Sequence, residues 1–80
     1  MNKIVFTDNG FWEYKRFELE ERDDGVWYND LEIDREFKVN GCLVSLLKEG
    51  KKRGYFFKVK EEYYFDLERE DEIMDWLEER

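Results

Sequence analysis

The sequence contains no histidine, no glutamine and no proline, and only one serine, one threonine and one cysteine. Without histidine, none of the three possible nucleophiles, Ser45, Thr7 and Cys42, has an evident general base. A zinc site would lack histidine and all but one thiolate. We therefore expect no enzymatic activity, no bound metal and no cofactor.

Long apolar segments are also missing. No run approaches the roughly 18 residues of a membrane span, and residues 1–9 lack the apolar centre of a signal peptide. A single cysteine cannot form an internal disulfide, which fits a reducing compartment. We expect a cytoplasmic protein that has no membrane partner.

The composition predicts one folded domain over residues 1–80. Hydrophobic residues make up 41% of the chain and aromatic residues 19%, against 45% charged residues. That apolar content argues against disorder and suffices for one modest core.

Charge is distributed unevenly along the chain, whose net charge is −8. Residues 1–47 hold eleven acids and six bases, residues 48–60 one acid and six bases, and residues 61–80 ten acids and two bases. The C-terminal quarter is therefore strongly acidic and is preceded by a basic segment. Such polarity bears on partners and association rates, and not on the fold.

The first half of the chain is typical of β-strands. Residues 3–7 and 11–19 predict a hairpin joined at Asn9-Gly10, and a change in apolar register indicates a bulge near Lys15-Arg16. Another strand begins at Val26.

Residues 31–39 alternate apolar and charged side chains, which predicts a strand. Its core face would carry Leu31 and Ile33. Its outer face would be an acidic row of Glu32, Asp34 and Glu36.

Asn40-Gly41 is the strongest turn signal in the sequence. It predicts a second hairpin in which Val39 lies opposite Cys42 and Phe37 opposite Val44, leaving Cys42 buried. The basic residues after it would then form the loop of the next hairpin; they are Lys48, Lys51, Lys52 and Arg53.

Residues 55–67 hold six of the fifteen aromatic residues and are also predicted as strand. Alternation assigns Tyr55, Phe57 and Val59 to the core face and Phe56 to the other face. Glu61-Glu62 is a poor turn signal, so the sequence does not define the course of the backbone there. We interpret four other aromatic residues as core and not as a ligand platform: Trp12, Trp27, Tyr28 and Trp76. An aromatic side chain left exposed beside an acidic rim would be a binding anchor.

From residue 68 the periodicity becomes helical. Ile73, Met74 and Leu77, with Trp76 at the margin, form the apolar side of the predicted helix. The opposite side is an arc of six carboxylates, which we call the acidic arc: Glu68, Asp71, Glu72, Asp75, Glu78 and Glu79. Three like-charge pairs spaced i,i+4 within this arc each cost roughly 0.2–0.5 kcal/mol.

We therefore predict a single α+β domain. Residues 1–67 would form mainly a β-meander, giving a curved or partly closed antiparallel sheet of about five to six strands. Residues 68–80 would form one C-terminal acidic helix packed on that sheet.

The acidic arc permits two interpretations. It can be a solvated surface that maintains solubility, or it can dock on a basic protein, with Glu32, Asp34 and Glu36 contributing if they lie beside the helix. About one charge per 3 Å along the helix approaches the phosphate density of a DNA strand. The hypothesis we carry forward is a non-enzymatic inhibitor that occupies the phosphate-binding surface of a basic, nucleic-acid-binding partner.

Two alternatives remain. The cluster of Lys48, Lys51, Lys52 and Arg53 could bind DNA or RNA directly, although a net charge of −8 opposes this. The protein could also be a structural subunit that assembles through its strand edges.

In general character, a small, acidic, aromatic-rich domain without catalytic residues is similar to phage-encoded anti-CRISPR and anti-restriction inhibitors and to immunity proteins of nuclease toxins. No residue pattern carries this likeness, so no functional residues are transferred from those groups.

Overall fold

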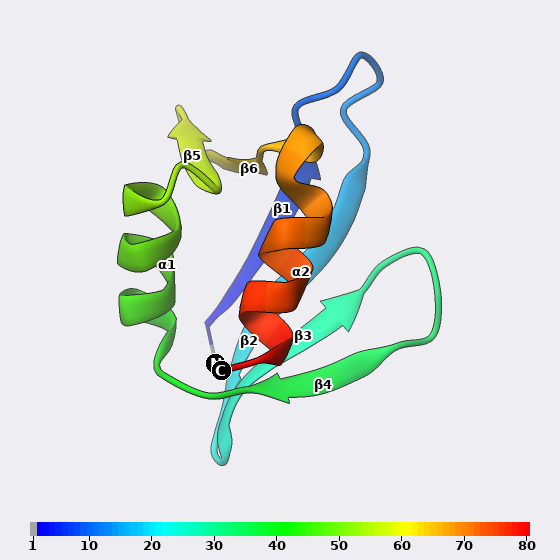
Figure 1. Cartoon of the computed structure of the whole chain (residues 1–80). Helices are drawn as coiled ribbons and strands as arrows, with labels where there is room; N and C mark the ends of the chain where they lie inside the picture. The colour runs from blue at the N-terminus through cyan, green and yellow to red at the C-terminus, as the bar shows by residue number, and fades with distance from the viewer. Residues whose placement is uncertain (1) are drawn as a thin grey trace.

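The computed structural model describes residues 2–80, which form a six-stranded mixed sheet with two helices packed on it (Figure 1). The strands are β1 (Lys3–Asp8), β2 (Lys15–Arg22), β3 (Gly25–Asp30), β4 (Glu36–Val39), β5 (Phe56–Val59) and β6 (Glu62–Phe65). The helices are α1 (Leu43–Lys52) and α2 (Glu70–Glu78), and a short 3-10 turn, η1 (Leu67–Arg69), precedes α2. The predicted α+β class and the C-terminal helix are confirmed.

The order of strands across the sheet is β4-β3-β2-β1-β6-β5. Every pairing is antiparallel except that of β1 with β6, which is parallel. Helix α1 carries the chain from β4 at one edge to β5 at the other, so β6 runs back beside β1 in the same direction (Figure 1). The predicted antiparallel sheet is thus confirmed for four of its five pairings, but the sheet is mixed at β1–β6 and is open instead of partly closed.

The hydrophobic core lies between the two helices and one face of the sheet. Alternate strand residues point into it, and each helix adds residues from one side, which is the pattern expected when only one face of a sheet is covered. Phe6 stacks on Phe17 with ring centroids 4.9 Å apart, and Phe17 stacks on Tyr28 at 5.1 Å. The buried core residues are Phe6, Phe17, Leu19, Val26, Tyr28, Val39, Leu43, Leu46, Tyr55, Phe56, Phe65, Ile73 and Leu77.

The largest correction concerns residues 42–52, predicted as a strand and a basic loop but folded as α1. Gly41, at φ +124°, ends the extended segment, and Cys42 is the exposed N-cap and not a buried strand residue. Leu43, Leu46 and Gly50 are buried on one side of the helix. Their i, i+3, i+7 spacing is a helical signal that the expected Asn-Gly hairpin obscured.

Two further predictions about strands are wrong. Leu31 and Ile33 lie in an exposed loop, because β4 begins only at Glu36. In β5, Phe56 is buried and Phe57 is exposed, the reverse of the predicted faces. Phe56 is aligned with Phe65 of β6, and a shift of one residue in register exchanges the two faces of a strand.

The bulge predicted near Lys15-Arg16 is confirmed. Phe6 pairs with Phe17, whereas the next residue, Thr7, pairs with Lys15, so Arg16 is skipped in the ladder. The connection before it spans residues 9–14 and is longer than the tight Asn-Gly turn predicted.

We predict that Gly50→Ala destabilises the protein by about 1–3 kcal/mol, because a methyl group at this position would overlap the buried ring of Phe56. At an exposed helical position the same change would stabilise by roughly 1 kcal/mol. Urea denaturation measures the difference, and Lys52→Ala, at an exposed position of the same helix, is the control. A more stable Gly50→Ala variant would show that the helix does not pack on Phe56 as described.

Candidate partner-binding surface

The connection between β1 and β2 carries the most exposed aromatic side chains of the described chain. Phe11 is 88% exposed, Trp12 72% and Tyr14 58%. Phe11 and Trp12 contact each other edge to face, with ring centroids 4.9 Å apart and planes at 84°. We call residues 9–14 the aromatic tip. Trp12 is thus not a core residue, contrary to the prediction.

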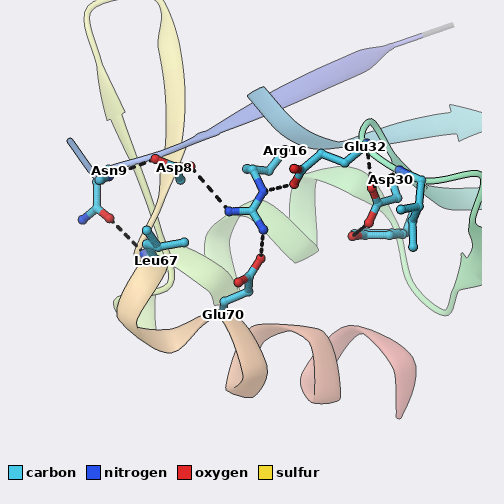
Figure 2. Close-up of polar contacts among 10 residues, drawn as sticks. Asp8, Asn9, Arg16, Asp30, Glu32, Leu67 and Glu70 are labelled. Carbon is cyan, nitrogen blue, oxygen red and sulfur yellow. Dashed lines mark hydrogen bonds and ion pairs between the residues drawn. The ribbon is translucent and has the colours of Figure 1, made fainter. Parts of the chain in front are cut away.

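The base of the aromatic tip is fixed by hydrogen bonds. The backbone N–H of Asp8 donates to the carbonyl of Tyr14 at 2.9 Å, and the N–H of Gly10 donates to the carboxylate of Asp8 at 3.0 Å. The Asn9 side-chain carbonyl accepts from the N–H of Leu67 at 2.9 Å (Figure 2). The tip is therefore attached to the turn that begins the C-terminal helix.

Arg16, the bulge residue, joins three segments of this region (Figure 2). Its guanidinium donates to Glu70 at the start of α2 at 2.6 Å, to Asp8 at 3.5 Å, and to Glu32 of the β3–β4 loop. Burial lowers the pKa of Arg16, but the nearby carboxylates of Glu70 and Glu32 outweigh burial and raise it. Arg16 thus remains charged and holds the tip, the helix and the loop together.

All six residues of the acidic arc are exposed, as predicted. Glu72 accepts a hydrogen bond from the hydroxyl of Tyr55 at 2.7 Å, which raises the pKa of Tyr55, and Glu78 is paired with Arg35. Within residues 2–80, no ion pair neutralises Glu68, Asp71, Asp75 or Glu79. Two-thirds of the arc is thus free to meet an outside cation.

The predicted row of Glu32, Asp34 and Glu36 is divided by the structure. Glu32 reaches the α2 side through Arg16, and Asp34 lies on the exposed loop. Glu36 belongs to β4 and pairs with Arg22 at 3.2 Å on the sheet face that no helix covers. Only Glu32 of this row is therefore linked to α2, whereas Asp34 and Glu36 line the same hollow as Arg22.

The basic cluster is also divided. Its residues occupy the last turns of α1 and the following residue instead of a hairpin loop. Arg53 pairs with Glu49 at 3.2 Å. Lys48 and Lys51 face a cleft beside β5, while Lys52 does not line that cleft.

The candidate surface thus consists of the aromatic tip and the acidic helix α2. The two are joined through the turn before α2, and both lie on an open mixed sheet. Comparisons with models of protein families, with curated proteins and with solved structures find no match to this chain. In the part of the chain that the structure describes, no helix is long and apolar enough to cross a membrane. Nor do residues 2–80 contain a group of three or more cysteine, aspartate or glutamate side chains placed to hold a metal ion.

The aromatic tip is the candidate binding feature that the prediction from the sequence missed. Phe11 and Trp12 are adjacent and follow the turn residues Asn9-Gly10 directly, so both cannot point into a core from one strand. Two consecutive bulky aromatic residues at a turn are the signal that could have revealed it.

The β3–β4 loop is held by Asp30, whose carboxylate accepts from the N–H groups of Glu32 at 2.7 Å and Ile33 at 3.0 Å. Burial raises the pKa of this carboxyl, but these hydrogen bonds outweigh burial and lower it below the usual value. The charged form is therefore favoured by folding.

We predict that Asp30→Asn lowers the free energy of unfolding by about 1 kcal/mol at pH 7. Because the folded pKa is depressed, this stabilisation is complete above the unfolded value of roughly 3.9 and is lost as the pH falls through the folded pKa. Denaturation of both proteins between pH 7 and pH 2 should show the difference shrinking. Asp34→Asn in the same loop is the control, and a difference independent of pH would contradict this role of Asp30.

Proposed function

We propose that this protein is a small, non-enzymatic inhibitor that binds a basic, nucleic-acid-binding partner through the aromatic tip and the acidic arc. The observation that carries the proposal is the attachment of two exposed aromatic rings, Phe11 and Trp12, to the acidic start of α2. Aromatic anchors beside charged groups are typical of the energetic centre of protein interfaces.

The acidic arc supports the choice of a basic partner. Asp71 and Asp75, and Asp75 and Glu79, are like-charge pairs at i,i+4, which weaken an isolated helix by roughly 0.2–0.5 kcal/mol each. Glu78 and Glu79 also lie at the C-terminal end of α2, where the helix dipole opposes negative charge. A cationic partner would relieve this repulsion, and opposite charge would accelerate its association.

In the proposed mechanism the carboxylates occupy a lysine- and arginine-rich surface that otherwise holds phosphates. The two aromatic rings exclude water at one end of the contact, which strengthens the neighbouring ion pairs. The nucleic acid is then denied its site. Phage counter-defence, such as anti-CRISPR or anti-restriction activity, and immunity to a nuclease are both functions of this kind, and the proposal includes a cytoplasmic location.

We predict that neutralising the arc with Asp71→Asn, Glu72→Gln, Asp75→Asn and Glu79→Gln abolishes capture of the partner from a host lysate. The melting temperature should stay the same or rise, because repulsion is removed and the amide carbonyl introduced by Glu72→Gln can still accept from Tyr55. The matched control removes four charges elsewhere through Glu21→Gln, Asp23→Asn, Glu61→Gln and Glu62→Gln. Equal capture by both variants would eliminate the arc as the docking surface.

We predict that Phe11→Ala combined with Trp12→Ala weakens partner binding at least tenfold, because an aromatic residue at the energetic centre of an interface contributes about 2 kcal/mol or more. Since both side chains are exposed, stability should change by less than about 0.5 kcal/mol. Calorimetric titration of the purified partner measures the affinity, and Phe57→Ala, at an exposed ring on β5, is the control. An unchanged affinity would exclude the aromatic tip from the interface.

The inhibitory mechanism has its own test. A captured partner should release its DNA or RNA when this protein is added, and the effect should weaken as the salt concentration rises. A partner that still binds nucleic acid when saturated would contradict inhibition. A gel shift of DNA or RNA by this protein alone would favour the alternative of a nucleic-acid-binding module.

A further inference from the structure

A cleft of about 300 Å³ lies between α1 and the β5–β6 hairpin, away from the aromatic tip. Its apolar walls include Leu47 of α1, Phe56 of β5 and Tyr63 of β6. Three lysines stand around them: Lys48 and Lys51 from α1, and Lys58 from β5. We call this feature the lysine cleft.

The apolar walls are continuous with the core. Phe56 is 3% exposed and its ring lies 4.4 Å from that of Phe6, while Tyr63 lies 5.8 Å from Phe6. Trp76 of α2 supports Phe56 from another side, with ring centroids 5.8 Å apart. These walls are therefore formed before a ligand arrives, which reduces the entropy that binding costs.

None of the three lysines has an acidic partner, which is true of every described lysine except Lys3; what sets these three apart is that they line one cleft. Within residues 2–80, each of the six arginines makes an ion pair, whereas Lys48, Lys51 and Lys58 make none. Lys58 lies over the ring of Tyr63, with its ammonium 5.2 Å from the ring centroid. In a chain with a net charge of −8, three unpaired cations around one hollow form a local positive site.

We propose that the lysine cleft binds a small amphipathic anion. The apolar body of the ligand, one or two rings in size, lies against Leu47, Phe56 and Tyr63, and its carboxylate or phosphate lies among the three ammonium groups. An apolar interior with a few convergent polar groups is the usual composition of a ligand pocket, and a volume of about 300 Å³ is at the small end of the range. A nucleic-acid strand is a poorer occupant, because the acidic remainder of the surface repels it.

The test is an NMR titration of the 15N-labelled protein with three probes. These are 2-naphthoate, 2-naphthyl phosphate and the neutral 2-naphthylmethanol. We expect both anions to shift the amide signals of Leu47, Lys58 and Tyr63, and the neutral probe to bind at least tenfold more weakly. The ratio of the two anion affinities identifies the preferred head group. Shifts confined to Phe11 and Trp12, or equal binding of the neutral probe, would overturn the proposal.

Lysine variants separate this site from general electrostatics. Lys48→Met combined with Lys51→Met should weaken 2-naphthoate binding roughly three- to thirtyfold, as expected for two partly exposed ion pairs. Lys52→Met, on the same helix but outside the lysine cleft, should leave binding unchanged. Thermal melts verify that both variants fold. An equal loss in Lys52→Met, or no loss in the double variant, would overturn the proposal.

Discussion

The contact on which the candidate surface depends is that of Arg16 with Asp8, Glu32 and Glu70. Asp8 is only 3% exposed, and a buried carboxylate is costly unless it is paired and hydrogen-bonded. Arg16 supplies the charge, and its planar guanidinium can serve several acceptors at once. Lys15 and Phe17, on either side of Arg16, both pair with β1, whereas Arg16 is skipped by the bulge. The Arg16 side chain is therefore outside the regular alternation of the strand and can point toward α2.

This arrangement turns separate parts of the chain into one surface. The aromatic tip is attached to the turn before α2 through Asn9, and α2 is attached to the sheet through buried Ile73 and Leu77. Packing of that apolar side supports a helix whose opposite side is self-repelling, since most helical stability in proteins comes from tertiary contacts. Exposed rings held on a fixed base lose little entropy on binding, which is the property that a binding anchor requires.

Prediction from the sequence succeeded where the local residue pattern was compatible with only one secondary structure. The apolar side of α2, the bulge at Arg16 and the acidic arc followed from helical and strand periodicity, except that Glu68 lies in η1 and not in α2. The prediction failed where tertiary context decided: residues 43–52 contain both alternating and helical spacings, and packing of Leu43, Leu46 and Gly50 against the core favours the helix. The parallel pairing of β1 with β6 and the meeting of the aromatic tip with Leu67 join residues about 58 positions apart, which no local pattern encodes.

The most direct test of this account is hydrogen exchange in Arg16→Met, which keeps an apolar stem and removes the charge. If Arg16 holds the three segments together, the amides of Gly10, Leu67 and Ile33 should exchange at least tenfold faster than in the unmodified protein. The amides of the central strands, such as those of Leu19 in β2 and Tyr28 in β3, should keep their protection relative to the global stability. Unchanged exchange in all three segments would contradict the claim that Arg16 organises the surface.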